Sequence, residues 1–153
     1  MTNLRERFTG DLKDAMKAGD KGKVAAIRLV QAALKDKDIE ARGAGKGEAT
    51  PDEILALLQK MIKQRQESIA IYDANNRPEL AAGERAEVEV ISSYLPKQMS
   101  DEEVKVAIDQ AIAETGASAV KDMGKVIGAL RGAYAGQMDF GAVGPMVKDK
   151  LLA

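Results

Sequence analysis

Residues 121–136 read KDMGKVIGALRGAYAG, and glycine recurs in them at every fourth position, as Gly124, Gly128, Gly132 and Gly136. The apolar residues between the glycines keep the three-and-four spacing of a helix side that packs against a core. These residues are Met123, Ile127, Leu130 and Tyr134. The stretch is therefore predicted to form an amphipathic helix, although each glycine inside a helix costs roughly 1 kcal/mol relative to alanine. Only Gly136 has a simple explanation, as a helix C-cap.

The side of this helix opposite the apolar residues is predicted to be both bare and basic. On a helical wheel of about 100° per residue, the glycines share that side with Lys121, Lys125 and Arg131. We call this surface the glycine face, and two interpretations of it stay open. A neighbouring helix could pack on the glycines while the basic side chains extend outward. Alternatively, an anionic group such as an RNA phosphate could approach the exposed backbone.

The composition indicates a soluble, globular chain without a strong overall charge. The 153 residues suffice for one ordinary domain or two small ones, and the net charge is −1. Contact with RNA would therefore need a local basic patch. The chain has no cysteine, no apolar run of membrane-spanning length and no signal-peptide pattern at its N-terminus. We expect a cytoplasmic protein with neither a membrane nor DNA as its partner.

The absence of histidine narrows the chemistry that the chain could perform. Without histidine or cysteine, catalysis would rest on carboxylates, lysine or serine, and the commonest metal ligands are missing. We expect no metal and no cofactor. The chain has no tryptophan, two phenylalanines and three tyrosines, so it offers few rings on which bases could stack. Sequence-specific recognition of single-stranded RNA is therefore not expected.

Four helices are predicted in residues 1–95. The first runs from about Leu4 to Ala18, and the second has an apolar centre from Val24 to Leu34 and a charged, solvated continuation, KDKDIEARG. Arg28 interrupts that apolar centre and should need a carboxylate partner. The third helix runs from the N-cap at Thr50 to about Tyr72, and the fourth from Pro78 to Leu95. The acidic flank of the fourth helix is expected to form salt bridges with the basic side of the third; it comprises Glu84, Glu87 and Glu89.

Three further helices are predicted in residues 101–153. The segment LPKQMS, residues 95–100, is the one boundary that the sequence indicates, and Ser100 should cap the fifth helix. A turn at 115–118 leads into the glycine helix, and a last helix begins near Asp139. No strand pattern is present, so the fold class is all-α. It comprises an N-terminal region resembling a four-helix bundle (1–95) and a small C-terminal three-helix bundle (101–153).

Two linked motifs resemble those of a known family. The order LLQKMIKQRQESIAIYDANNRPELAAGERAEVEVISSYLPKQMSDEEV, followed by KDMGKVIGAL, resembles a stand-alone YqeY-like protein. The C-terminal part is similar to the tail domain of the B subunit (GatB) of glutamyl/aspartyl-tRNA amidotransferase. The resemblance covers nearly the whole chain and implies an all-helical protein, whose tail-like part helps to hold tRNA. Lys121, Gly124, Lys125 and Gly128 match the motif of that tail.

The resemblance does not carry catalysis with it. The kinase and transamidase chemistry of the B subunit belongs to a larger domain without a counterpart here, and the glutaminase chemistry belongs to another subunit. Ser92 and Ser93 are predicted to lie on a helix, without the Gly/Ser-rich loop of an amidase site.

The leading hypothesis is therefore a non-catalytic, tRNA-associated or amidotransferase-associated helper. It would dock the elbow of folded tRNA by shape and phosphate contacts on the glycine face, together with Lys148 and Lys150. The protein partners would be amidotransferase or aminoacyl-tRNA synthetase components. One alternative is a protein-interaction module of the same fold. Another is a carbon-nitrogen ligase activity that uses glutamine as amido donor, only as part of a complex.

Overall fold

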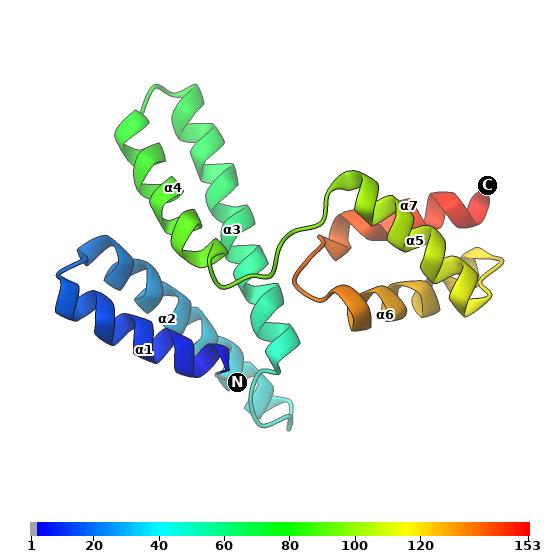
Figure 1. The fold of residues 1–153 in the computed structure, drawn as a ribbon, viewed down its shortest axis with the longest axis horizontal. Coiled ribbons are helices and arrows are strands. Elements are labelled where there is room, and N and C mark those ends of the chain that lie inside the picture. Colours follow the sequence, from blue (N-terminus) through cyan, green and yellow to red (C-terminus); the bar gives the residue numbers. More distant parts are fainter. Residues whose placement is uncertain (1–2) are drawn as a thin grey trace. The chain divides into compact units, whose positions relative to one another are not determined.

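The computed structural model describes residues 3–153, and all regular secondary structure in that range is helical (Figure 1). The predicted all-α fold class is thereby confirmed. The chain divides into two compact units, Met1–Leu95 and Pro96–Ala153, which are described separately below. The helices of the first unit are α1 (Leu4–Ala18), α2 (Lys21–Gly43), α3 (Pro51–Ala74) and α4 (Pro78–Ser92). Those of the second are α5 (Asp101–Thr115), the 3-10 helix η1 (Val120–Asp122), α6 (Met123–Tyr134) and α7 (Phe140–Leu152).

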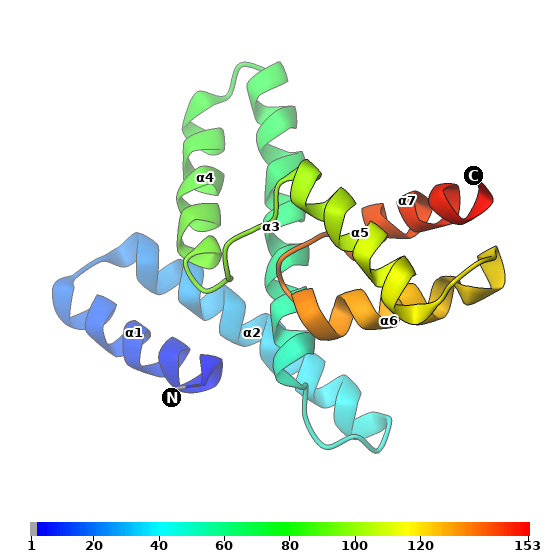
Figure 2. The ribbon, with the colours of Figure 1, turned by 45° about the vertical axis from the view of Figure 1, so that its right-hand side comes forward.

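The first unit consists of two helical hairpins, α1 with α2 and α3 with α4, as Figures 1 and 2 show. Local signals fix where these helices begin. The Asn3 side chain accepts a hydrogen bond from the Glu6 N–H at 2.8 Å, and Thr50 and Glu53 form the predicted capping box. Five large side chains in the core between the hairpins are completely buried: Phe8, Ile27, Val30, Leu58 and Ile91.

Two expectations for the second helix are wrong. Arg28 is exposed, as is its apolar neighbour Leu29, so Arg28 does not need a buried carboxylate partner. The physical reason is that α2 packs against α1, α4 and, less extensively, α3 through the side that carries Ile27 and Val30. The charged continuation is also not fully solvated, because Asp38 is only 9% exposed.

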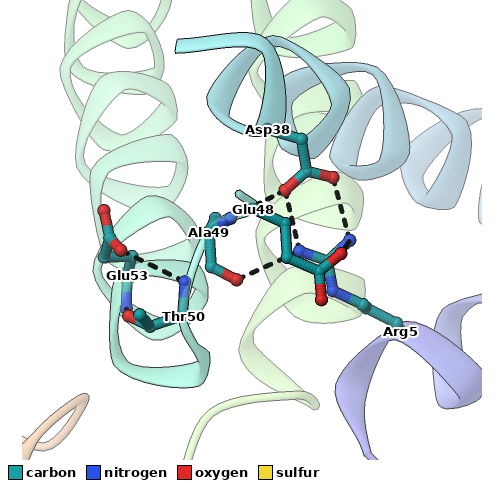
Figure 3. Close-up of polar contacts among 6 residues, drawn as sticks. All are labelled: Arg5, Asp38, Glu48, Ala49, Thr50 and Glu53. Carbon is teal, nitrogen blue, oxygen red and sulfur yellow. Dashed lines mark hydrogen bonds and ion pairs between the residues drawn. The ribbon is translucent and has the colours of Figure 1, made fainter. Parts of the chain in front are cut away.

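Asp38 is the centre of a polar cluster that joins α1, α2 and the loop before α3 (Figure 3). The two terminal nitrogens of Arg5 donate to the two carboxylate oxygens of Asp38 at 2.9 and 2.8 Å. Arg5 also donates to the carbonyl of Ala49 at 3.1 Å, while the Ala49 N–H donates to Asp38 at 2.9 Å. The hydrogen bond from Arg5, followed by that from Ala49, lowers the pKa of Asp38 to about 2.

The predicted salt bridges between the third and fourth helices are confirmed for two of the three glutamates. The Arg65 Nε lies 2.7 Å from a carboxylate oxygen of Glu87 and 4.0 Å from one of Glu84. Arg65 is accordingly half-buried between α3 and α4, and does not extend into solvent as its basic neighbours do. The acidic flank of α4 therefore has a structural role in holding this hairpin together.

The second unit packs α6 against both α5 and α7 around its own core. The predicted apolar side of the glycine helix contacts this core, but only Leu130 of its four residues is fully buried. Val126, which the wheel did not single out, is completely buried. Because α6 has a helix on either side, its buried surface is wider than a single narrow stripe and is centred on Val126 and Leu130.

The last helix begins where the sequence indicates. The Asp139 side chain accepts a hydrogen bond from the Gly141 N–H at 2.9 Å, and α7 then continues through Gly144 and Pro145 to Leu152. Gly144 is buried, and a Cβ built at this position would lie 3.7 Å from the Cε of Met123, the first residue of α6. Within residues 3–153, no helix combines the length and the apolar character that crossing a membrane requires.

Candidate nucleic-acid interface on helix α6

The turn that precedes α6 is held by Asp122, the last residue of η1. Its carboxylate accepts hydrogen bonds from the N–H groups of Ser118 at 3.0 Å and Ala119 at 3.3 Å. The bond from Ser118 is the main cause of a lowered pKa of Asp122, to which the nearby Lys125 and Lys121 contribute. Lys121 lies in η1, two residues before α6 begins at Met123. The predicted start of the glycine helix at Lys121 is therefore two residues too early.

The end of α6 differs from the expected glycine cap. The helix ends at Tyr134, and Ala135 has φ −52° and ψ 130°, which is extended backbone. Gly136 follows with φ +78°, and the Gln137 N–H donates to the Tyr134 carbonyl at 3.0 Å. These values describe a type II turn with glycine at its third position. Gly136 is thus required by the turn after α6, and its prediction as the C-cap is wrong by one residue.

The three glycines inside α6 face open space. Gly124, Gly128 and Gly132 are all exposed, and a Cβ built on any of them would meet no heavy atom of the described chain within 4 Å beyond its own helix neighbourhood. The interpretation that a neighbouring helix of the same unit packs on these glycines is therefore wrong. Because all three adopt helical backbone, alanine would also fit them and would favour the helix by roughly 1 kcal/mol at each position. The fold itself does not require glycine here.

The basic residues of the glycine face are exposed alongside these glycines. Lys121, Lys125 and Arg131 all reach solvent, and no carboxylate within residues 3–153 lies within 4.0 Å of their charged nitrogens. The Arg131 guanidinium carbon lies 5.5 Å from the centre of the Phe140 ring, within the range of a cation–π contact. This contact orients Arg131 beside the junction of α6 and α7 and leaves its N–H groups able to bind an anion.

The two lysines expected to extend this face lie on α7 and differ in their surroundings. Lys148 is exposed, and so is Lys150. The Lys150 Nζ lies 3.2 Å from a carboxylate oxygen of Asp109 on α5, and both side chains are about half exposed. Such a pair contributes little to stability, but it offsets the charge of Lys150 locally. The three cations on η1 and α6 form no ion pair within 4.0 Å in residues 3–153, and the carboxylate near Lys121 and Lys125 is that of Asp122.

The serines that invite comparison with an amidase site lie at the end of α4. The Ser93 hydroxyl donates to the Val90 carbonyl at 2.6 Å, which is a common way for serine to cap a helix turn. Ser92 is the last residue of α4 and is exposed. The Ser93 contact is to a backbone carbonyl and does not resemble that of a serine activated by a neighbouring base, which a nucleophile requires.

Sequence reasoning located the exposed residues of this site but missed the polar contacts around it. The Asp122 cap and the Arg131–Phe140 contact both join residues that are near in sequence but lie on different turns or helices. A signal for the first was present, because an acidic side chain three residues after the N-cap position can accept from the N-cap N–H, as in a capping box. No comparable signal identified Phe140 as the partner of Arg131.

Comparisons with known proteins agree with the family resemblance of the linked motifs. The model of the family described as "Yqey-like protein" matches residues 5–151. The curated relatives include "Altered inheritance of mitochondria protein 41, mitochondrial" of Saccharomyces cerevisiae, 38% identical over 86 residues. The protein of the same name from Vanderwaltozyma polyspora is 39% identical over 85 residues. These matches cover 56% of this chain and 45% and 44% of the two yeast proteins, so the chain spans less than half of their length.

The family assignment rests on the extent of the first match. Residues 5–151 cover all but the outermost residues of the two compact units and include the whole of α6. A match of this length covers every element from which the candidate interface is built. The protein belongs to the Yqey-like protein family.

Proposed function

We propose that this protein is a non-catalytic helper that docks folded tRNA through the glycine face. The observation that carries the proposal is the open space over Gly124, Gly128 and Gly132. Three helix-weakening residues recur there although neither backbone conformation nor packing requires them. A ligand that must approach the helix backbone closely supplies the missing reason, because any side chain at these positions would hold it away.

The charges around the glycines favour phosphate as the group that approaches. Lys121 and Lys125 lie beside the glycines towards the start of α6, and Arg131 lies near its end. Arginine and lysine are the principal phosphate contacts in nucleic-acid interfaces, and these contacts carry no sequence information. The few aromatic residues of the chain do not offer a stacking surface for single-stranded bases, which favours recognition of a folded RNA by shape.

The resemblance of KDMGKVIGAL to the tail of the amidotransferase B subunit supports tRNA in particular. In that enzyme the tail helps to hold tRNA, and the matching positions here include Gly124, Lys125 and Gly128. Amidotransferase or aminoacyl-tRNA synthetase components would then be natural protein partners. We expect the cytoplasm as the compartment, with which the absence of cysteine is compatible. The printed names of the yeast relatives describe those proteins as mitochondrial.

A second candidate function is a protein-interaction module that seats a partner helix on the same face. Ala129 and Ala133 are exposed next to the glycines and widen the surface of small residues. A flat surface of this kind also allows the close approach of another helix. The two candidates differ in what they bind and in how strongly the binding depends on salt.

The test is a titration of the full chain with folded tRNA between about 50 and 200 mM salt, where phosphate-driven binding weakens steeply. Gly128→Leu should abolish binding, since its side chain would occupy the open space over the backbone. The matched control is Gly83→Leu, because Gly83 is also an exposed helical glycine with nothing within 4 Å. Absence of tRNA binding by the parent chain at low salt, or equal loss in both variants, would refute the proposal.

Lys125→Ala separates a phosphate contact from simple steric blocking. Loss of one phosphate contact should weaken binding to all tRNAs alike and reduce the slope of log affinity against log salt by about one. Lys13→Ala on α1 serves as its control, because Lys13 is an exposed lysine of the other unit. If a partner helix is the true ligand, neither lysine variant should change a tRNA titration.

A further inference from the structure

The first unit has a groove between α2 and α3, lined by one side of each helix. The two helices lie at an angle to each other (Figure 2), so they diverge along part of their length and leave a space of about 470 Å³. On α2 the lining extends from Leu29 to Glu40. At a rise of about 1.5 Å per residue, this lining is roughly 16 Å long, which equals three turns of helix.

The floor of the groove and part of one wall are apolar. Leu57 and Met61 on α3 are only 8% and 6% exposed and form the floor. Leu29 and Ala33 on α2 belong to the wall, and Leu29 is 43% exposed. A single exposed leucine is ordinary on a protein surface. Leu29, however, adjoins a concave apolar surface between two helices, and such a groove fits the apolar side of a third helix.

The two rims of the groove carry opposite charges. Asp36, Lys37 and Glu40 lie on the α2 rim, so two carboxylates and one ammonium leave one net negative charge. The Lys37 Nζ lies 3.3 Å from a carboxylate oxygen of Glu40, whereas Asp36 is exposed. Lys60 is exposed on the α3 rim, where Arg65 pairs with the acidic flank of α4. Neither Asp36 nor Lys60 has an ion-pair partner within 4.0 Å in residues 3–153.

We propose that this groove binds an amphipathic helix of a partner protein, with basic residues along one flank of its apolar side and acidic residues along the other. The apolar side would cover Leu29, and the two flanks would meet Asp36 and Lys60. The rim charges stand on separate helices and are exposed, whereas sites for small ligands place a few polar groups around one point. The inference concerns the first unit and does not depend on the function proposed for the glycine face.

The test is a titration of the full chain with three synthetic helical peptides of about four turns. The peptides share one leucine-rich side and differ only in its flanks, which are mixed (one lysine, one glutamate), both lysine or both glutamate. The mixed peptide should bind most tightly, because each of the others places like charges against one rim. Turning a helix end to end exchanges its flanks, so the mixed peptide matches both rims in one of its two directions. Methyl shifts of Leu29, Leu57 and Met61 should follow the binding.

Leu29→Glu should weaken binding of the mixed peptide by about tenfold or more, because the apolar contact is lost. The matched control is Leu80→Glu on α4, which changes a leucine that is 46% exposed and lies outside the groove. Both variants change exposed side chains, so both should retain the melting temperature of the parent.

Reversing one rim charge tests the complementarity independently. Asp36→Lys makes both rims basic and should transfer the preference to the peptide with two glutamate flanks. Lys60→Glu makes both rims acidic and should transfer it to the peptide with two lysine flanks.

Three results would overturn the proposal. They are no saturable binding of the mixed peptide up to about 1 mM, equal affinities of Leu29→Glu and Leu80→Glu, and a peptide preference that neither rim variant changes. Dimerisation of the parent that Leu29→Glu abolishes and Leu80→Glu preserves would assign the groove to a second copy of this chain, and would overturn the partner proposed here.

Discussion

Replacing the three exposed glycines of α6 by alanine should stabilise the second unit and weaken its ligand binding at the same time. Alanine is favoured over glycine by roughly 1 kcal/mol per helix position, so the triple variant at Gly124, Gly128 and Gly132 should gain about 2 to 3 kcal/mol. No neighbouring atom opposes the added methyl groups, because none lies within 4 Å of the built Cβ positions. For a unit of this size, that gain corresponds to a rise in melting temperature of roughly 10 to 20 °C.

The assay is a thermal unfolding series of the full chain, followed by the methyl signals of Val126 and Leu130 in the core of the second unit. Gly10→Ala on α1 and Gly83→Ala on α4 are matched controls. Both change an exposed helical glycine with open space, but they lie in the first unit and should leave those signals unaffected.

The triple alanine variant is also expected to bind tRNA more weakly than the parent, because three methyl groups would stand over the approached backbone. A variant that melts no higher than the parent would refute the structural part of the reasoning, since it would mean that the glycines are needed for the fold. A variant that is more stable and binds tRNA unchanged would refute the functional part.

Three other outcomes are expected. Asp38→Asn should destabilise the first unit. Because the pKa of Asp38 is lowered on folding, the parent should lose about 2 kcal/mol of stability as pH falls from about 4 to 2, and the variant should not show this loss. Acid unfolding monitored by circular dichroism checks this, and an equal loss in parent and variant would contradict it. The fragments 1–95 and 96–153, expressed separately, should each fold, since each has its own core; a fragment without a cooperative melt would show that the core is shared. Glutamine hydrolysis and tRNA amidation by the chain alone should be at background, and turnover that disappears in Ser92→Ala or Ser93→Ala would contradict the non-catalytic proposal.

The starts of α3 and α5 could be predicted from the sequence because the interactions that set them are local. The Ser100 side chain accepts from the Glu103 N–H at 3.2 Å, and the Glu103 side chain accepts from the Ser100 N–H at 3.1 Å. Thr50 and Glu53 repeat this pattern at the start of α3. A capping box involves residues three positions apart, so its spacing in the sequence is nearly its geometry in space.

The partly buried ion pair of the first unit could not be predicted, for the opposite reason. Arg5 and Asp38 are 33 positions apart and meet only after α1 and α2 have formed their hairpin. Within KDKDIEARG, the periodicity does not say which acidic residue points inward, and the low hydrophobicity of the segment suggested a fully solvated surface. The contact depends on how α1 and α2 pack against each other, and the local sequence pattern carries no information on that packing.

The glycine face lies between these two cases. A helical wheel gives the direction in which each side chain of α6 points, and it correctly separated the glycines from the core side. It cannot say whether another helix covers the far side, because that depends on how α5 and α7 pack around α6. The structure answers this question for the second unit, since Gly124, Gly128 and Gly132 remain uncovered.

Because no part of the unit covers Gly124, Gly128 and Gly132, the fold of the unit does not explain why glycine occupies these positions. Propensity, packing and backbone conformation each favour alanine or are indifferent at Gly124, Gly128 and Gly132. A position at which every intramolecular influence favours another residue is where a functional constraint is expected. Gly136 provides the internal comparison, because its φ of +78° explains that glycine completely without reference to any ligand. The same four-residue repeat thus contains one glycine that the fold requires and three that it does not require, and the proposed ligand contact is our explanation for those three.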